Sequence, residues 1–317
     1  MKVIDFLESS RRTLISFEII PPPRGSSAAE VYEIVDELIG FAPPFIDVTS
    51  HAADSTYMEA EDGSFRRQIK RKRPGTLGLC AALKYRYKVE TVPHLLCRGF
   101  SRQETEDALI ELNYLGIENV LAIRGDDTAY RKTQPHGRRV NEYALDLVRQ
   151  IANMNRGRYE EELLNAAETD FCIGVGGYPE KHPDSPSLEA DVRYLKQKVA
   201  AGAHYVVTQM FFLNSEYFAF VDRCRAAGIK VPIIPGVKLL TRRHQLHSLP
   251  HHFRVNIPDD LVQAFEAADS DSERREIGVD CATRQVAELM EAKVPCIHFY
   301  VMKDVKSVQR VVRKLTA

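Results

Sequence analysis

Residues 14–20, which read LISFEII, and the three prolines at 21–23 that end this run decide the fold of the chain. Short runs rich in β-branched and aromatic residues, bounded by turn-forming residues, are typical of β-strands. Seven more such runs follow, at 45–50, 91–96, 119–124, 171–175, 205–212, 231–237 and 296–302. The sequence therefore predicts eight strands spread over the whole chain.

Amphipathic helical patterns lie between these strands. The clearest one starts at Ser101, which forms the Ser-x-x-Glu pattern of a capping box with Glu104, and it ends before Gly116. Two more are predicted over 188–201 and 217–227, each followed by a glycine that suits a helix C-terminus. This alternation predicts an α/β fold, a (β/α)8 TIM barrel with extra peripheral helices, with an open doubly wound sheet as the alternative.

Length and composition predict one domain that spans residues 1–317. Hydrophobic residues make up 44% of the chain and charged residues 27%, as in ordinary globular proteins. The 43 Lys and Arg side chains against 44 Asp and Glu give a net charge of −1, so no basic field favours a nucleic-acid partner. No apolar window is long enough to span a membrane, and the first residues do not resemble a signal peptide, so we expect a cytoplasmic protein.

Active sites of TIM barrels gather at the carboxyl ends of the strands and in the loops that follow them. Three of these loops are predicted to be long, at 51–66, 125–140 and 238–258. Long loops on this face commonly hold ligands. We therefore expect the functional residues at this end of the barrel.

The first strand brings a carboxyl group to that end. Alternate side chains point to opposite faces of a strand, so Leu14, Ser16 and Glu18 share one face, while the apolar residues between them suit contact with helices. Glu18 is therefore predicted to point into the barrel mouth. Burial there would raise the pKa of its carboxyl group and allow it to act as a general acid, with a structural ion pair to an arginine as the alternative.

Other strand ends also carry polar side chains. The run 119–124 leads into Arg124-Gly125-Asp126, which places a cation, a flexible residue and a carboxylate at the rim. Arg-Gly-Asp is also a cell-adhesion motif, but the expected cytoplasmic location argues against a role in adhesion. His94 lies within the third run, where a satisfied core histidine is the alternative to a ligand-binding one. Gln209 offers an amide that can hydrogen-bond the edge of a heterocycle.

The fifth strand is followed by GVGGYPEKHP at residues 174–183. Its glycine spacing misses the dinucleotide pattern G-x-G-x-x-G by one residue and lacks the βαβ context of that motif, so we do not expect a dinucleotide site of that kind. Tyr178 and His182 place an aromatic ring and an imidazole on this loop. Both are candidates for ligand binding.

Nine motifs together resemble those of a known family. They are SFEIIPP (16–22), VTS (48–50), VPHLLC (92–97), LAIRGD (121–126), GYPEKHP (177–183), the stretch 191–198, TQMFF (208–212), IIPG (233–236) and IHFY (297–300). In this order, over nearly the whole chain, they are similar to 5,10-methylenetetrahydrofolate reductases of the bacterial, catalytic-domain-only type. The resemblance implies a homo-oligomeric flavoprotein that holds FAD at the barrel mouth, takes electrons from NADH or NADPH, and reduces 5,10-methylenetetrahydrofolate to 5-methyltetrahydrofolate.

The resemblance also implies roles for individual residues. Glu18 corresponds to the general acid that protonates N10 of the folate, so that the methylene bridge opens to an iminium. Asp126 corresponds to a carboxylate beside flavin and folate, where its charge would tune the flavin and favour the iminium. Gln209 corresponds to an amide that contacts folate, and it completes the expected substrate site with Glu18 and Asp126. The positions that correspond to FAD-binding residues are Thr49, His94, Arg124, Gly125, Asp126, Tyr178, His182, Asp191 and Lys198.

The chain departs from the family pattern in two places. Lys303-Asp304 stands where bacterial members have an arginine that contacts folate, and the topology places Arg242 and Arg243 nearest to replace it. The loop at 241–244 lacks the family's usual aromatic residue for the nicotinamide and folate site. A folate-reducing flavin subunit of a partner-dependent electron-transfer complex is therefore the alternative function. A barrel lyase without a redox cofactor is a third.

A histidine cluster and a basic run resemble a metal site and a nucleic-acid-binding patch, but neither function is predicted. Four histidines lie within residues 244–252, but no coordinating acid follows at helical spacing and Pro250 is expected to break a helix, so no metal site is predicted. The basic run 66–73 resembles a nucleic-acid-binding patch, but acidic residues precede it, and we interpret it as the solvated face of a helix. The polar stretch 153–170 is expected to form a peripheral helix or loop.

Overall fold

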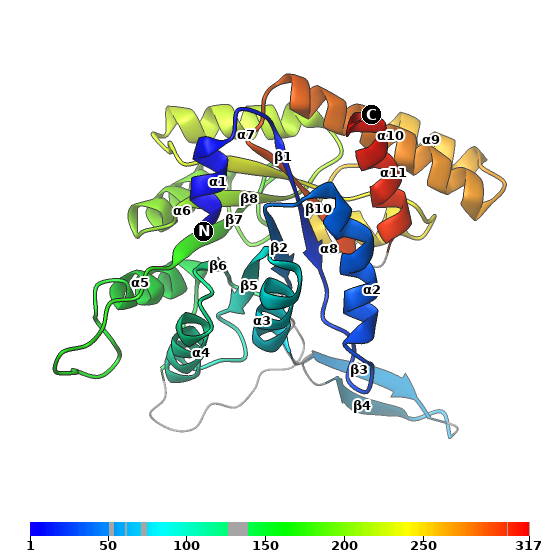
Figure 1. Cartoon of the computed structure of the whole chain (residues 1–317). Coiled ribbons are helices and arrows are strands. Elements are labelled where there is room, and N and C mark those ends of the chain that lie inside the picture. The colour runs from blue at the N-terminus through cyan, green and yellow to red at the C-terminus, as the bar shows by residue number, and fades with distance from the viewer. Residues whose placement is uncertain (51–53, 61, 71–74, 126–138, 303, 317) are drawn as a thin grey trace.

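The computed structural model describes the chain except for residues 51–53, 61, 71–74, 126–138, 303 and 317. Eight parallel strands close into a barrel in the order β1-β10-β9-β8-β7-β6-β5-β2 (Figure 1). The closed order confirms the predicted TIM barrel and excludes the open sheet. The barrel strands are β1 (Leu14–Ile19), β2 (Phe45–Val48), β5 (Glu90–Leu96), β6 (Asn119–Ile123), β7 (Cys172–Gly177), β8 (Tyr205–Met210), β9 (Ile233–Val237) and β10 (Cys296–Met302).

Helices surround the barrel, and those predicted from the sequence lie within a few residues of their expected positions. Ser101 caps its helix as predicted, because its hydroxyl accepts from the N–H of Glu104 at 3.2 Å and its own N–H donates to the Glu104 carboxylate at 2.7 Å. The helices are α1 (Val3–Ser9), α2 (Ala29–Leu38), the 3-10 turn η1 (Ile39–Phe41), α3 (Thr76–Tyr87), α4 (Arg102–Tyr114), α5 (Ala144–Met154), α6 (Leu188–Ala200), α7 (Asn214–Ala226), α8 (Gln245–Phe253), α9 (Asp259–Ala267), α10 (Asp271–Glu291) and α11 (Val305–Thr316).

The side chains of the barrel strands divide between two apolar clusters. Phe17 and Ile19 of β1 belong to a large cluster that strands and surrounding helices share, and both are fully buried. Leu14 packs instead against a second cluster, which includes Phe45 and Tyr205 and fills the barrel interior. The predicted alternation along β1 is therefore confirmed, and it places every second residue of this strand on the inner face.

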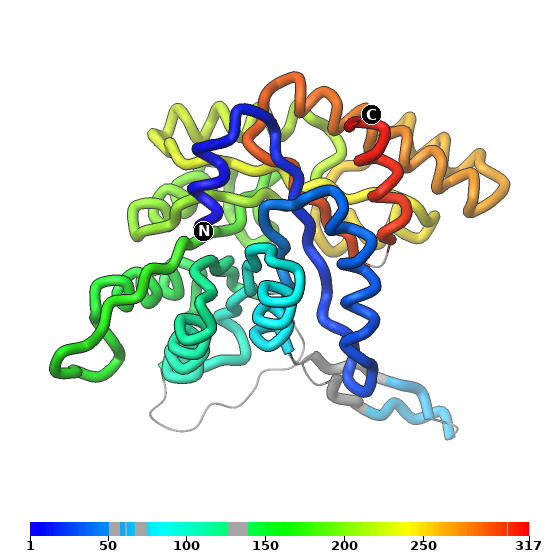
Figure 2. Tube along the Cα trace, viewed as in Figure 1, coloured from blue at the N-terminus to red at the C-terminus, as the bar shows by residue number. Residues whose placement is uncertain are grey.

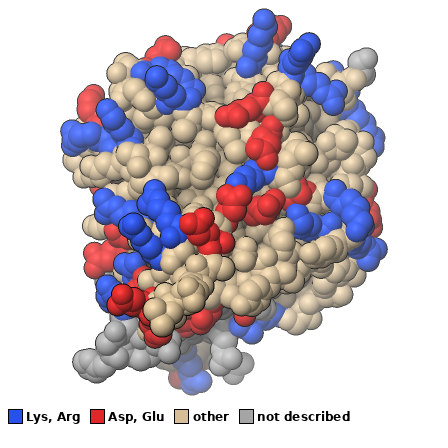
Figure 3. All heavy atoms as spheres, turned by 60° about the vertical axis from the view of Figure 1, so that its left-hand side comes forward, with Lys and Arg blue, Asp and Glu red and all other residues tan. Residues whose placement is uncertain are grey.

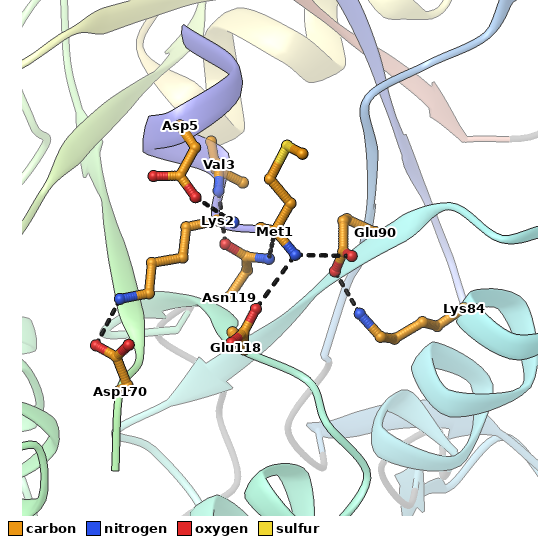
Figure 4. A network of polar contacts seen from close by, with 9 residues as sticks. All are labelled: Met1, Lys2, Val3, Asp5, Lys84, Glu90, Glu118, Asn119 and Asp170. Carbon is orange, nitrogen blue, oxygen red and sulfur yellow. Dashed lines mark hydrogen bonds and ion pairs between the residues drawn. The ribbon is translucent and has the colours of Figure 1, made fainter. Parts of the chain in front are cut away.

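Helix α1 closes the amino-terminal end of the barrel (Figure 4). Val3 belongs to the inner cluster, and its main-chain N–H donates to Oδ1 of Asn119 at 2.7 Å. Nδ2 of Asn119 donates to the carbonyl of Met1 at 3.1 Å, and the α-amino group of Met1 lies 3.0 Å from Glu90 and 3.2 Å from Glu118. The first N–H groups of a helix have no partner within it, so Asn119 satisfies one that would otherwise be buried unpaired.

The segment after β2 differs from the prediction. Strands β3 (Asp54–Glu59) and β4 (Phe65–Lys70) form an antiparallel hairpin that projects from the barrel (Figure 2). Gly63, with φ +75°, lies in the turn between them. The interpretations of 51–66 as a loop and of 66–73 as a helix face are therefore wrong, because the described residues of both segments satisfy their backbone groups by pairing with one another.

The loop after β9 also contains regular structure. Helix α8 continues through Pro250, so the expectation that this proline breaks the helix is wrong. The helix ends at Arg254, which has φ +57° and donates its N–H to the carbonyl of Pro250 at 3.0 Å. The polar stretch 153–170 contains no helix or strand after Met154, so the loop was the correct one of its two predicted forms.

Charged side chains of both signs are interspersed over the face that Figure 3 shows. This distribution agrees with the near-equal numbers of basic and acidic residues in the sequence. Mixed charges of this kind keep a surface hydrated without creating a field of one sign. That nucleic acid is not a partner stays a prediction.

Candidate active site

Glu18 lies near the carboxyl end of β1, at the mouth of the barrel. It is buried, with 9% of the residue exposed. In the barrel register it lies beside Asp47 of β2 on one side and Tyr300 of β10 on the other. Because it belongs to a strand that is hydrogen-bonded on both sides, its carboxyl group has a rigid support.

An imidazole lies between Glu18 and a second carboxyl group. Nε2 of His94, on β5, is 3.2 Å from Oδ2 of Asp47 and 3.6 Å from Oε2 of Glu18. Strands β1, β2 and β5 are neighbours in the barrel, which explains why these three side chains meet. Burial alone lowers the pKa of His94, but the hydrogen bond with Asp47 and the charges of Glu18 and Asp47 outweigh it and raise the pKa above its usual value.

Strand β10 adds a histidine and a tyrosine to the same site. Nε2 of His298 is 3.9 Å from Oε2 of Glu18, while its Nδ1 is 2.8 Å from the hydroxyl of Ser16. The hydroxyl of Tyr300 donates to the main-chain carbonyl of Thr208 at 2.6 Å. Burial and the nearby carboxylates raise the pKa of Tyr300 well above its usual value, so this hydroxyl stays protonated.

Four residues of this site are not predicted by the sequence analysis, namely Asp47, His298, Tyr300 and Lys238. Nζ of Lys238 donates to the carbonyl of Tyr300 at 3.1 Å. Burial lowers the pKa of Lys238 to about 8, although the charges of Asp304 and Glu18 oppose this shift. A usable signal existed for Asp47, which is the one charged residue of the apolar run 45–50.

A second group of predicted residues lies beyond the ends of β6 and β7. Nη1 of Arg124 is 2.7 Å from Oδ2 of Asp184. Nδ1 of His182 accepts from the N–H of Asp184 at 3.0 Å, and the N–H of His182 donates to Oδ2 of Asp191 at 2.9 Å. Nζ of Lys198 donates to a main-chain carbonyl at the end of β7 at 2.8 Å. The structure therefore brings Arg124, His182, Asp191 and Lys198 into one neighbourhood.

The electrostatics of this second group suit an anionic ligand. Burial lowers the pKa of Lys198 to about 8, against the charge of Asp191. Burial also lowers the pKa of His182, and the charges of Arg124 and Lys198 add to this shift. Nε of Arg124 is buried without a hydrogen-bond partner among the described residues. An anion bound here could accept a hydrogen bond from this Nε, and Tyr178, whose ring packs edge-on against His182 at 4.5 Å, offers an apolar surface beside it.

The remaining predicted site residues are less closely grouped. Thr49 is buried directly after β2. Gly125 follows β6 with φ +84°, a conformation that glycine adopts without strain. Gln209 is half-buried on β8 and turns its Oε1 to the main-chain N–H of the next residue at 2.9 Å. Asp126 lies outside the described residues.

A pocket of ≈ 280 Å³ opens beside the first group, between β5, α3 and α4. His94 lines it, and most of its other lining side chains are apolar, among them Leu77, Leu95 and Phe100. Ligand pockets commonly have volumes of about 300–1,000 Å³. The volume of this pocket therefore lies close to the lower end of that range.

No group of three or more His, Cys, Asp or Glu side chains that could hold a metal ion occurs among the described residues. Within residues 244–252, the rings of His251 and His252 contact each other at 5.1 Å. In the same part of the chain that the structure describes, none of the helices is long and apolar enough to cross a lipid bilayer.

Known proteins are similar to this chain in sequence or in fold. The family model described as methylenetetrahydrofolate reductase matches residues 2–316. The chain belongs to this family. The 5,10-methylenetetrahydrofolate reductase of Pectobacterium carotovorum subsp. carotovorum is 30% identical over 296 residues, which are 93% of this chain and 87% of that protein.

Eukaryotic members of the methylenetetrahydrofolate reductase family are longer. Methylenetetrahydrofolate reductase 1 of Schizosaccharomyces pombe is 30% identical over 99% of this chain but only 48% of its own length, so the chain spans about half of that relative. Among solved structures, an uncharacterized protein from Clostridium thermocellum that binds two copies of 5-methyl-5,6,7,8-tetrahydrofolic acid has a TM-score of 0.56, with 12% identity and 99% of both chains covered. At this identity the likeness supports the fold alone.

Proposed function

We propose that this chain is a methylenetetrahydrofolate reductase that uses FAD, reducing 5,10-methylenetetrahydrofolate to 5-methyltetrahydrofolate with electrons from NADH or NADPH. The observation that carries the proposal is a buried carboxyl group, Glu18, at the mouth of a TIM barrel whose sequence belongs to this family. Barrels of this kind carry their catalytic groups at this end. Residues 1–317 would form one FAD-binding catalytic domain, cytoplasmic and homo-oligomeric.

The second group of residues would hold the cofactor. Arg124, His182 and Lys198 are suited to the diphosphate and ribose, because one guanidinium nitrogen is buried without a partner and the ammonium group is desolvated. The other FAD-binding positions in the proposal are Thr49, His94, Gly125, Asp126, Tyr178 and Asp191. When bound, FAD supplies hydride transfer between the nicotinamide and the folate.

The first group of residues would act on the folate. Glu18 donates a proton to N10, so that the methylene bridge opens to an iminium whose carbon can accept a hydride. Asp126 provides a negative charge that favours this cation, and Gln209 hydrogen-bonds the pterin. Glu18 is suited to this role because it lies on a rigid strand and faces the Nε2 atom of His94 at 3.6 Å.

The visible absorption spectrum of the purified protein tests the proposal first. We expect a bound flavin, bleached anaerobically by NADH or NADPH and restored to its oxidised spectrum by methylenetetrahydrofolate, with 5-methyltetrahydrofolate as the product. A colourless protein that binds no added FAD would overturn the proposal and favour a lyase.

A second candidate is the flavin subunit of a partner-dependent complex. The loop at 241–244 favours it, because Arg242 and Arg243 are exposed at the start of α8 and could contact another protein. In that case neither NADH nor NADPH would reduce the flavin. Flavin that is already reduced would still be oxidised by methylenetetrahydrofolate, as described above.

A further inference from the structure

Asp47 is a charged side chain without contact to solvent. It is 0% exposed, and its Oδ1 has no hydrogen-bond partner among the described residues. Its other oxygen, Oδ2, faces Nε2 of His94 at 3.2 Å. A buried carboxylate is costly unless a cation or hydrogen bonds compensate for the lost water. The function proposed above gives Asp47 no role, although it lies next to the general acid.

The ring of His94 connects Asp47 with Glu18. Its Nε2 must carry a proton to donate a hydrogen bond to Asp47, and the same atom is 3.6 Å from Oε2 of Glu18. The charge of Asp47, and that of Glu18 once it is ionised, stabilises the protonated imidazole, and the raised pKa of His94 agrees with this. The proton on Nε2 therefore lies one short movement away from Glu18.

We propose that Asp47 is a positioning residue that keeps His94 protonated beside Glu18, so that His94 replaces the proton that Glu18 gives to the folate. The inference rests on the proposed function. The carboxyl group of Glu18 gives its proton to N10 and becomes a carboxylate, and the proton on Nε2 of His94 then moves to Oε2 of Glu18. Solvent returns one proton to the imidazole in each turnover. Since the hydride comes from the nicotinamide nucleotide, one proton is consumed for each folate reduced.

Other titratable groups face this cluster from the neighbouring strands. His298, on β10, is 3.9 Å from Glu18, but its Nδ1 is engaged with the hydroxyl of Ser16. Burial raises the pKa of Tyr300 on β10 and of Tyr205 on β8 well above the usual value, so both stay neutral. Nζ of Lys238 on β9 is hydrogen-bonded to a main-chain carbonyl. His94 is distinguished from these groups because its Nε2 faces both carboxyl groups.

The pKa of His94, measured by an NMR titration in the absence of folate, tests whether Asp47 keeps this imidazole protonated. We expect the flavin-loaded wild type to show a histidine pKa above 6.5, assigned by its loss in His94→Gln. In Asp47→Asn the side chain keeps its size but loses its charge, and the pKa of His94 should fall by about one unit or more. An unchanged pKa in Asp47→Asn would overturn the inference, whether or not the protein reduces folate.

The pH dependence of the folate half-reaction tests whether the proton of His94 is transferred to Glu18. With pre-reduced flavin, Asp47→Asn should move the basic limb of the rate profile to lower pH by roughly one to three units. Flavin reduction by the nicotinamide and the KM for folate should stay as in the wild type, because the proton transfer serves only the folate half-reaction and Asp47, which is 0% exposed, is not among the residues proposed to bind either ligand. Asp222→Asn, a charge loss at an exposed position of α7, is the matched control.

Four other outcomes are decisive. An unmoved basic limb in Asp47→Asn overturns the inference, and so does a limb that moves in His298→Gln instead. If Asp47→Asn does not fold, His94→Gln replaces it, and a profile that keeps its wild-type basic limb in that variant overturns the inference. If the wild type carries flavin but does not oxidise it with folate, the proposed function fails, and a raised pKa of His94 in the same sample shows that the two failures are separate.

Discussion

Asn119, at the amino-terminal end of the barrel, and Asp47 and Arg124, at its mouth, differ in whether their buried side-chain atoms have hydrogen-bond partners. At the amino-terminal end, the side chain of Asn119 makes hydrogen bonds to Val3 and to Met1, and neither side-chain atom of this amide lacks a partner (Figure 4). At the mouth, Oδ1 of Asp47 and Nε of Arg124 are buried and have no hydrogen-bond partner among the described residues. Both ends are built from the same strands, so the contrast lies in the side chains.

Satisfied and unsatisfied groups contribute to different properties. A buried polar group with all its partners contributes to stability, whereas an unsatisfied one costs free energy unless a ligand or a proton completes it. We therefore expect substitutions at the amino-terminal end to change the free energy of unfolding and leave catalysis intact. Substitutions at the mouth should change ligand binding or proton transfer first.

The largest effect is expected at the mouth, in Glu18→Gln. Glutamine keeps the size of the side chain but cannot donate the proton, so the folate half-reaction should slow by roughly 10²- to 10⁴-fold. Bound flavin and its reduction by the nicotinamide should not change, because neither needs this proton. Rapid mixing of each half-reaction measures the difference, with the exposed substitution Glu33→Gln as the control. An unimpaired folate half-reaction would contradict the role of Glu18.

The next effect is expected in the anionic site, in Lys198→Ala. A charge-assisted hydrogen bond contributes about 1.5–3 kcal/mol, so the affinity for FAD should fall by roughly ten- to a hundredfold. Titration of the flavin-free protein with FAD, followed by fluorescence quenching, measures this change. Lys196→Ala removes an exposed lysine from the same helix and should bind FAD as the wild type does. Equal affinities in the two variants would place the cofactor elsewhere.

At the closed end, Asn119→Ala should reduce stability and leave both half-reactions unchanged. The substitution leaves the N–H of Val3 buried without a partner, which costs about 1–3 kcal/mol. For a chain of 317 residues the melting temperature should fall by roughly 1–2 °C for each kcal/mol. Asn113→Ala, at an exposed position of α4, is the control. A loss of catalysis at a temperature where the variant is folded would break the division between the two ends.

The barrel was predictable because its strands are apolar runs with turn residues at their ends. The hairpin of β3 and β4 was not, because the sequence from 54 to 70 shows neither a run of apolar residues nor a helical period. Period two along β1 was enough to predict that Glu18 faces the mouth. Its contact with Asp47 and His94 depends instead on which strands become neighbours when the barrel closes, and a single sequence does not contain that register.

The smallest effect is expected at Glu180, in the loop after β7. Its Oε2 accepts from the N–H of Asn256 at 2.7 Å, while its Oε1 is buried without a partner in the described part of the chain. Burial raises the pKa of Glu180 from 4.5 to about 7, although the bond with Asn256 opposes this shift. Because the folded state binds the proton more tightly than the unfolded chain, this carboxyl group contributes stability below about pH 4.5 that is lost as the pH rises through about 7.

Glu180→Gln should therefore be more stable than the wild type at pH 8, by about 2 °C in melting temperature, and close to it near pH 4.5. Glutamine resembles the protonated carboxyl group and can still accept from Asn256, so it removes the cost of ionisation and keeps the hydrogen bond. Glu162→Gln, at an exposed position, should show no such dependence on pH. If Glu180→Gln is instead less stable at pH 8, the charged form of Glu180 strengthens its bond to Asn256 by more than its burial costs.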